Sequence, residues 1–304
     1  MDDIRPFLAN VLRGRRVPPA RVEEVAHHYE MFGGVSPLTA ITNKQARGLE
    51  AGLADRQLSL PVYVGMRNWH PLLADTLRRM AADGARHAVG LILAPHRSYS
   101  SCGQYRQNVI DARAELASAG LPSIGVTYVG DWHTHPKFVE ANAAHVRKAM
   151  GHLPDAARAG ARLVFTAHSV PVSMAGAKKY ADQVQESASL VASALGAHDW
   201  TVVFQSRSGR PEDPWLGPDV CDYLRTIAGT VSGVVLVPIG FVCDHIEVLY
   251  DLDHEAAAVC KDVGLPMARA ETVNDDPLFL EMLADVVSSV VQRYRTGRPL
   301  EVIA

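Results

Sequence analysis

A series of acidic and imidazole side chains occupies the segment Asp244–Glu255. Glu247, Asp251 and Glu255 recur at every fourth position, so a helix would stack them along one face, and His254 joins them. The segment contains no Lys or Arg, although like charges at this spacing repel one another and a surface helix usually includes basic residues. Carboxylate oxygens and imidazole bind divalent cations, so the series indicates a metal site or a path for metal and protons. A solvated charged face is the alternative.

His168 follows an apolar run, Arg162–Ala167, that is typical of a buried strand. A lone histidine at a strand end is usually a hydrogen-bonded core or capping group. A histidine that faces a carboxylate can also transfer protons near neutral pH. Since ligands gather at the carboxyl ends of strands in open α/β sheets, we expect His168 and the acidic series to share a site.

Other candidate motifs are weaker. His133 and His135 have the spacing of a metal-binding pair, but no third ligand is near them in the sequence, which favours a structural role. The four cysteines form no C-x-x-C pair, which argues against a zinc site or a disulfide framework and indicates reduced thiols. The chain has no phosphate loop, dinucleotide fingerprint, hydrolase elbow or H-E-x-x-H motif.

The elements that must position these residues alternate between short apolar runs and longer helical patterns, which indicates parallel α/β architecture. A chain of 304 residues favours two packed lobes. The expected strands are residues 61–65, 88–94, 123–128, 162–167, 200–204 and 234–238. The expected helices are residues 71–83, 104–119, 140–150, 180–195, 219–227 and 278–295.

The charge balance limits the partners of the protein. Lys and Arg number 30 against 33 Asp and Glu, so no basic surface for nucleic acid is expected and a small-molecule partner is favoured. No apolar stretch long enough for a membrane span occurs, and the N-terminus lacks a signal-peptide pattern. We therefore expect a soluble cytoplasmic protein without integral membrane association.

Taken together, several segments resemble the ferrochelatase family, in the family's order and along nearly the whole chain. The matching segments are Phe32-Gly-Gly-Val-Ser-Pro-Leu38, Tyr63-Val-Gly-Met-Arg-Asn-Trp-His-Pro71, Leu93-Ala-Pro-His-Arg-Ser-Tyr-Ser100 with Tyr105, Phe165-Thr-Ala-His-Ser-Val-Pro171, Tyr180-x-x-Gln-x-x-Glu-Ser187, Gln205-Ser206, Asp213-Pro-Trp-Leu-Gly-Pro218 and Pro238-Ile-Gly-Phe-Val-Cys-Asp-His-Ile-Glu-Val-Leu-Tyr-Asp251. Each motif is modest alone, but their shared order is specific.

The resemblance implies two Rossmann-like lobes, each with a parallel four-stranded sheet, and a porphyrin cleft between them. The lobes would comprise residues 1–133 and 134–274, with a helix in 275–304 packing back on the first lobe. The family opens with a strand and loop that this sequence lacks. We therefore expect a first lobe short of its N-terminal strand and a natural start about 15–20 residues upstream.

The resemblance also implies an activity, the insertion of Fe²⁺ into a porphyrin with release of two protons during haem synthesis. His168 and Glu247 match the catalytic histidine and its facing glutamate, and Asp251 and Glu255 extend the acidic series, so all four are the expected metal contacts. The residues expected to hold porphyrin propionates are Ser36, Tyr105, Arg13, Arg15 and Arg16.

Fe²⁺ is expected as a substrate, with no tightly bound cofactor. No cysteine follows Cys260, so no [2Fe–2S] cluster is expected. Soluble members of the family that this chain resembles commonly use coproporphyrin III, whose four propionates suit a polar cleft, so the resemblance favours it over protoporphyrin IX as the porphyrin. A monomer is expected. Two alternatives stay open: a related tetrapyrrole chelatase that uses Co²⁺ or Ni²⁺, and a non-catalytic porphyrin or haem carrier. Retention of both His168 and Glu247 argues against the carrier, which needs only shape and propionate contacts.

Overall fold

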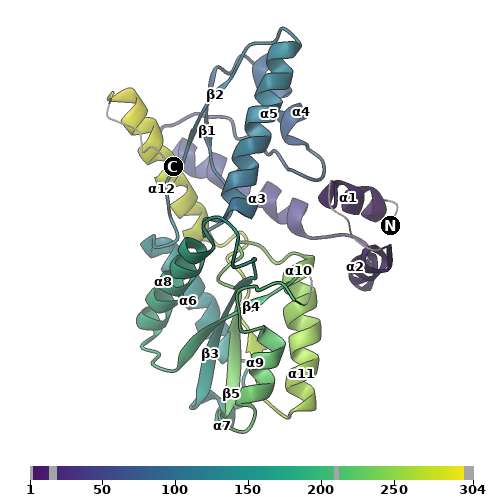
Figure 1. The fold of residues 1–304 in the computed structure, drawn as a ribbon. Coiled ribbons are helices and arrows are strands. Elements are labelled where there is room, and N and C mark those ends of the chain that lie inside the picture. The colour runs from purple at the N-terminus through teal and green to yellow at the C-terminus, as the bar shows by residue number, and fades with distance from the viewer. Residues whose placement is uncertain (1–2, 14–18, 209–211, 298–304) are drawn as a thin grey trace. The chain divides into compact units, whose positions relative to one another are not determined.

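The computed structural model describes residues 3–13, 19–208 and 212–297. They fold into two compact units, each assembled from separate stretches of the chain (Figure 1). The first unit comprises Met1–Ile92, Gly103–Val129 and Val287–Ala304, and the second comprises Leu93–Cys102 and Gly130–Val286. The chain therefore passes from one unit to the other after residues 92, 102, 129 and 286, and the lobe boundary expected after residue 133 stays a prediction.

The first unit contains a short parallel sheet. Strand β1 (His87–Gly90) pairs with β2 (Gly125–Tyr128), so two strands form this sheet in the described part of the chain. The sheet packs against helices α4 (Leu73–Ala82) and α5 (Gln104–Ser118), whose buried side chains form one core cluster with Ile124.

The prediction of a strand at residues 61–65 is wrong, because these residues, all of them described, form no strand. The backbone of this segment bonds to side chains instead of to a neighbouring strand. Val62 N donates to Glu50 Oε1 at 3.4 Å, and Val64 O accepts from Thr76 Oγ1 at 2.8 Å. These two backbone groups are therefore bonded without a strand ladder, which sequence periodicity alone does not reveal.

Helices that the sequence did not predict complete the first unit. Helix α1 (Ile4–Val11) packs on α2 (Pro19–Met31), and Ile4 and Leu8 bury their side chains in a small cluster. Helix α3 (Leu38–Asp55) follows and buries Leu49 and Leu53.

The second unit is built on a four-stranded parallel sheet with the order β4-β3-β5-β6. Three strands agree closely with the sequence prediction: β3 (Ala161–His168), β4 (Trp200–Gln205) and β5 (Gly233–Val237). The sequence missed β6 (Met267–Arg269), which has only three residues. Strands β3 and β5 are almost fully buried, as the near-continuous apolar runs of a covered parallel sheet require.

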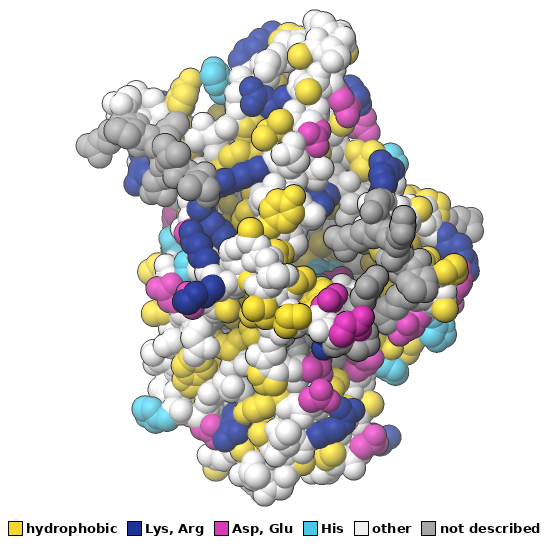
Figure 2. Space-filling view, viewed as in Figure 1, with side chains coloured by type: hydrophobic (Ala, Val, Ile, Leu, Met, Phe, Trp, Pro, Cys, Tyr) yellow, Lys and Arg dark blue, Asp and Glu magenta, His cyan; other side chains and the backbone are white. Residues whose placement is uncertain are grey.

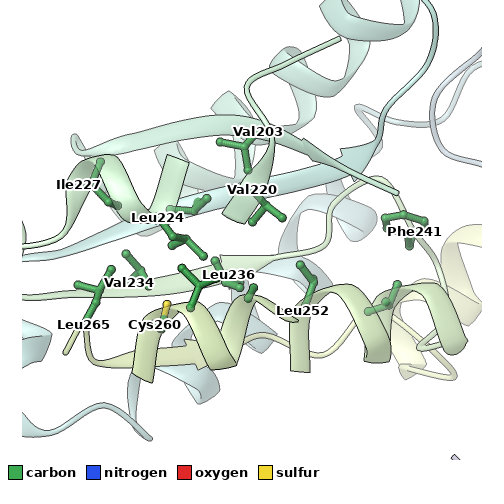
Figure 3. Close-up of a cluster of buried hydrophobic side chains, with 14 residues drawn as sticks. Val203, Val220, Leu224, Ile227, Val234, Leu236, Phe241, Leu252, Cys260 and Leu265 are labelled. Carbon is green, nitrogen blue, oxygen red and sulfur yellow. The ribbon is translucent and has the colours of Figure 1, made fainter. Parts of the chain in front are cut away.

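Helices cover both faces of this sheet. One face packs on α6 (Pro136–Met150) and α8 (Ala177–Leu195), and the other on α9 (Val220–Ile227) and α11 (Ala257–Asp262). Figure 3 shows the second interface, where Leu236 of β5 and Leu224 of α9 belong to one buried cluster. Both side chains are fully buried, and each contributes roughly 1.5–3 kcal/mol to folding.

Short helical elements connect the larger ones. They are η1 (Tyr99–Gly103), α7 (Asp155–Arg158), α10 (Ile246–Val248) and η2 (Leu249–Ala256), and a long helix, α12 (Pro277–Arg295), ends the described chain. The elements η1 and η2 are π-helices, which are uncommon and occur frequently at functional sites. None of the described helices is long and apolar enough to cross a membrane.

Candidate active site

The carboxyl edge of the second unit's sheet brings β3 and the chain after β5 together. Gly240 makes this approach possible, because a Cβ at this position would lie 2.6 Å from the Cβ of Ala167. Its backbone N donates to Thr166 O at 3.0 Å, which fixes the turn against β3. Only glycine fits here, and the turn therefore leads from β5 past the end of β3 into the acidic segment.

His168 is the last residue of β3 and is only partly exposed. Its Nδ1 lies 2.5 Å from Ser169 O, so we assign the proton to Nδ1 and the accepting lone pair to Nε2. The buried Tyr180 hydroxyl donates to His168 O at 3.0 Å and fixes the backbone. His168 thus presents one accepting nitrogen from a constrained position.

His245 lies directly before α10, and its ring forms a T-shaped pair with the ring of Phe241 at a centroid distance of 5.1 Å. Burial lowers the pKa of His245, the nearby Glu247 opposes this change, and His168 adds to it. The pKa of His245 therefore depends on both His168 and Glu247. Two imidazoles and one carboxylate share this end of the sheet.

Asp251, on η2, is the least exposed member of the acidic series. Its pKa is raised to about 7, mainly by burial and also by the neighbouring Glu247 and Glu255, while hydrogen bonds from Ser206 and Gln205 act in the opposite direction. Gln205 Nε2 donates to Asp251 Oδ2 at 3.1 Å, and the Ser206 hydroxyl donates to the same oxygen. This carboxyl group can therefore take up and release a proton near neutral pH.

Ser206 reaches Asp251 from a strained backbone. Its φ of 59° lies in the left-handed region, which non-glycine residues rarely adopt. The residue follows directly after β4, so the strand turns sharply at its carboxyl end to bring two neutral donors, Ser206 and Gln205, to one acid.

The remaining members of the series are solvent-exposed. Glu247 on α10 and Glu255 on η2 are exposed, whereas Asp251 between them is partly buried. Figure 2, which shows side chains by type, has acidic groups gathered where Figure 1 labels α10 and α11. His254, which the spacing predicted on the same face, contacts the ring of Tyr250 at a centroid distance of 5.3 Å instead. Nowhere in the described chain do three His, Cys, Asp or Glu groups converge as a metal site.

The residues expected to hold propionates belong to the first unit. Ser36 Oγ accepts from Leu38 N at 3.3 Å at the start of α3, and the guanidinium of Arg67 lies over the Tyr105 ring at 5.2 Å. Arg13 follows α1 and donates to Asn10 Oδ1 at 2.6 Å. Two further expected residues, Arg15 and Arg16, lie outside the described residues.

The two histidines with metal-pair spacing have separate structural roles. His133 Nε2 lies 2.9 Å from Glu186 Oε2, and its ring contacts the buried His96, whose pKa burial lowers to about 3. His135 instead caps α6, where its Nδ1 accepts from Lys137 N at 3.3 Å. Cys102, Cys221, Cys243 and Cys260 form no disulfide in the described structure.

Sequence reasoning gave no role to several residues of this site. His245, Gln205, Ser206 and Tyr180 all occur in the segments quoted above, but spacing did not single them out. One signal was available for two of them. A polar pair directly after the apolar run Thr201–Phe204 marks a strand end at the edge of a sheet where ligands bind.

Comparisons of the sequence with known proteins agree on one family. Residues 1–291 match the family model described as Ferrochelatase. The chain is 46% identical over 292 residues to a ferrochelatase of Rhodopirellula baltica, covering 94% of this chain and 81% of that protein. It is 44% identical over 316 residues to the coproporphyrin III ferrochelatase of Streptomyces griseus subsp. griseus, covering 99% and 84%.

Solved structures are similar in fold alone. SirB from Bacillus subtilis with Fe³⁺ aligns with a TM-score of 0.59 at 11% identity and covers 85% of this chain and 93% of that one. CbiX, described as the terminal enzyme for biosynthesis of sirohaem in denitrifying bacteria, aligns with a TM-score of 0.50 at 16% identity, covering 81% and 92%. The α/β architecture with parallel sheets is thus a chelatase-like fold.

Proposed function

Since the chain belongs to the ferrochelatase family, enzymes that insert iron into a porphyrin in haem synthesis, we propose that its substrates are Fe²⁺ and coproporphyrin III. The relative from Streptomyces griseus, 44% identical over nearly the whole chain, carries coproporphyrin III in its name. The observation that best supports a catalytic centre in the second unit is that His168, at the end of β3, and Glu247 on α10 both act on the pKa of His245.

The reaction replaces two pyrrole N–H bonds with bonds to iron, so two protons must leave the porphyrin as Fe²⁺ enters. We assign to His168 Nε2 the acceptance of a pyrrole proton, because Nδ1 is already bonded to Ser169 O. His245 and Glu247 stand within electrostatic range of one another and offer the next acceptors. Binding the ring in a distorted form would expose its nitrogen lone pairs and favour the transition state over the flat substrate.

Asp251 and Glu255 continue the acidic series beyond Glu247, and we propose that they carry Fe²⁺ inward or protons outward. A carboxyl group with a pKa of about 7 exchanges a proton readily at neutral pH, which suits a relay. Hard oxygen ligands also suit Fe²⁺ in passage. The acids follow one another along the helix and do not converge, an arrangement that fits transfer better than storage of an ion.

For the porphyrin itself we propose that Ser36, Tyr105, Arg13, Arg15 and Arg16 bind propionates. Hydroxyl and guanidinium groups donate strong hydrogen bonds to carboxylates. Ser36→Ala and Tyr105→Phe should each weaken coproporphyrin III binding by roughly 1 kcal/mol, measured by fluorescence titration. Equal affinities in both variants and the unaltered protein would mean that the propionates bind elsewhere.

An anaerobic spectroscopic assay tests the function. The protein should insert Fe²⁺ into coproporphyrin III with a higher kcat/KM than into protoporphyrin IX. His168→Ala should lose nearly all insertion, while its porphyrin affinity stays within about tenfold, because the residue acts on the transition state. Turnover by His168→Ala at the unaltered rate would refute the assignment. Parallel assays with Co²⁺ and Ni²⁺ distinguish a chelatase for another metal, and binding without turnover would indicate a carrier.

We further propose that the enzyme acts as a cytoplasmic monomer without a resident [2Fe–2S] cluster. The four cysteines are spread over the second unit, and Cys243 and Cys260 are buried free thiols. The iron content and visible spectrum of protein purified under anaerobic conditions, together with its mass by light scattering, test these points directly.

A further inference from the structure

Arg269, the last residue of β6, joins two distant acids of the segment that carries Glu247 and Asp251. Its Nη1 donates to Asp244 Oδ1 at 2.8 Å, and its Nε and Nη2 donate to the two carboxylate oxygens of Asp253 at 2.6 and 2.9 Å. Three of its hydrogen bonds therefore reach carboxylates on either side of α10 and the first half of η2. We call Arg269, Asp244 and Asp253 the arginine clamp.

The clamp is anchored at its Asp244 end. Asn274 Nδ2 donates to Asp244 Oδ2 at 2.8 Å, and Asp244 N donates back to Asn274 Oδ1 at 2.9 Å. Thr272 N donates to Asp244 Oδ1 at 3.3 Å. Asn274 makes these bonds from a positive φ of 39°. The side chains of Arg269 and Asp244 are each only 13% exposed, so solvent weakens this contact little.

The clamp spans a segment in which charge repulsion opposes the helical conformation. Glu247 and Asp251 both lie between Asp244 and Asp253, and their mutual repulsion opposes the close spacing that helix formation imposes. The π-helical hydrogen bonding of η2 is itself uncommon. A guanidinium suits the role because its planar fork binds the carboxylate of Asp253 with two parallel bonds and Asp244 with a third donor.

We propose that Arg269 is a positioning residue for metal insertion: by binding Asp244 and Asp253 together, it holds Glu247 and Asp251 in the π-helical arrangement that the reaction uses. This proposal rests on the function proposed above for those two acids. Arg269 acts through them and contacts no reacting group. Lysine at this position keeps the charge but loses the fork, so charge and geometry can be separated.

The test compares Arg269→Lys with a matched control, Arg162→Lys, in the full-length protein. Arg162 also makes two side-chain bonds, to Asp199 Oδ1 at 2.6 Å and to the Tyr223 hydroxyl at 3.0 Å, but lies near the amino end of β3. Two properties are measured for both variants: kcat and KM for Fe²⁺ insertion into coproporphyrin III, and backbone amide exchange in residues 246–256. Circular dichroism verifies that each variant is folded.

For Arg269→Lys we expect amide exchange in residues 246–256 to be about tenfold faster. We also expect kcat to be about tenfold lower, with the KM for porphyrin within about twofold. Arg162→Lys should change neither property. Unchanged exchange in Arg269→Lys would overturn the clamp, and faster exchange with unchanged kcat would show that the clamp is structural only. Failure of the function proposed above looks different, because the unaltered protein itself would then insert no iron.

A double variant adds an independent test. Asp253→Asn should lower kcat in the same direction as Arg269→Lys, and the double variant should be no worse than the more impaired single variant, because both break one contact. If the fold-loss of kcat in the double variant equals the product of the losses in the two single variants, Arg269 and Asp253 act separately, which overturns the proposal.

Discussion

Two groups of acids lie on the same stretch of chain and meet opposite surroundings. Asp244 and Asp253 face the guanidinium of Arg269. Asp251 instead receives hydrogen bonds from the neutral side chains of Gln205 and Ser206 and is close to two further acids. The acids bound to Arg269 hold the segment in place, whereas Asp251 is a carboxyl group that gains and loses a proton near neutral pH. The partner that faces a carboxylate therefore decides its role more than its place in the sequence does.

The largest expected effect separates the two groups by activity. Glu247→Gln should lower kcat by roughly 10²–10⁴-fold, the usual contribution of a group that transfers protons. Its unfolding free energy should stay within about 0.5 kcal/mol, because Glu247 is exposed. Asp262→Asn, an exposed acid at the end of α11, is the control and should leave both quantities unchanged. Comparable activity in Glu247→Gln and the control would mean that this acid is only a charged surface group.

Asp251→Asn should lower activity but raise stability above neutral pH. The pKa of Asp251 is raised from 3.8 to about 7, so between these values the unfolded chain has lost a proton that the folded protein keeps. The stability from this group is therefore complete below pH 4, falls as pH rises through that window and stays lost above pH 7. An asparagine Oδ1 accepts the same bonds without a charge.

Urea unfolding at several pH values tests whether Asp251→Asn raises the unfolding free energy above neutral pH. At pH 8 the variant should be more stable than the unaltered protein by roughly 1–4 kcal/mol, and the difference should shrink toward pH 4. A variant that is less stable at pH 8 would show that the ionised carboxylate is well solvated or paired, contrary to the contrast drawn above.

Substituting an acid of the arginine clamp should lower stability, the opposite of the effect expected for Asp251→Asn. Asp253→Asn should lower the unfolding free energy by about 1 kcal/mol, a modest value because the Asp253 side chain is 36% exposed. Asp222→Asn is the control, since Asp222 forms an ion pair with Arg225 on an exposed helix face and should contribute less. Equal changes in both variants would place Asp253 among ordinary surface ion pairs.

Much of this arrangement could be predicted from the sequence, because apolar runs determine buried strands. Strands β3, β4 and β5 begin and end within about two residues of their predicted bounds. Other elements depend on tertiary contacts. The described residues 61–65 form no strand, and two of their backbone groups bond to side chains instead, while β6 is too short for a periodic signal.

The same division holds at the site. The spacing of four residues predicted that Glu247, Asp251 and Glu255 would be neighbours. In the structure Glu247 and Glu255 are close enough to raise the pKa of Asp251. Spacing could not predict which acids of the segment would be neutralised, because Arg269 reaches them from a strand that follows later in the chain. The contribution of Ser206 depends on a positive φ that no sequence pattern specifies.

The smallest effect is expected at the solvent end of the series. Glu255 is exposed, and its charge acts on Asp251 mostly through water, so Glu255→Gln should change the insertion free-energy barrier by less than about 1 kcal/mol. The KM for Fe²⁺ should rise roughly two- to fivefold while kcat and the KM for porphyrin stay constant, because the residue attracts the cation before the chemical step. Raising the ionic strength should reduce this difference, since salt screens exposed charges. A fall in kcat as large as that of Glu247→Gln would mean that Glu255 takes part in the proton transfer itself, and the series would then act as one unit instead of a path graded from solvent to site.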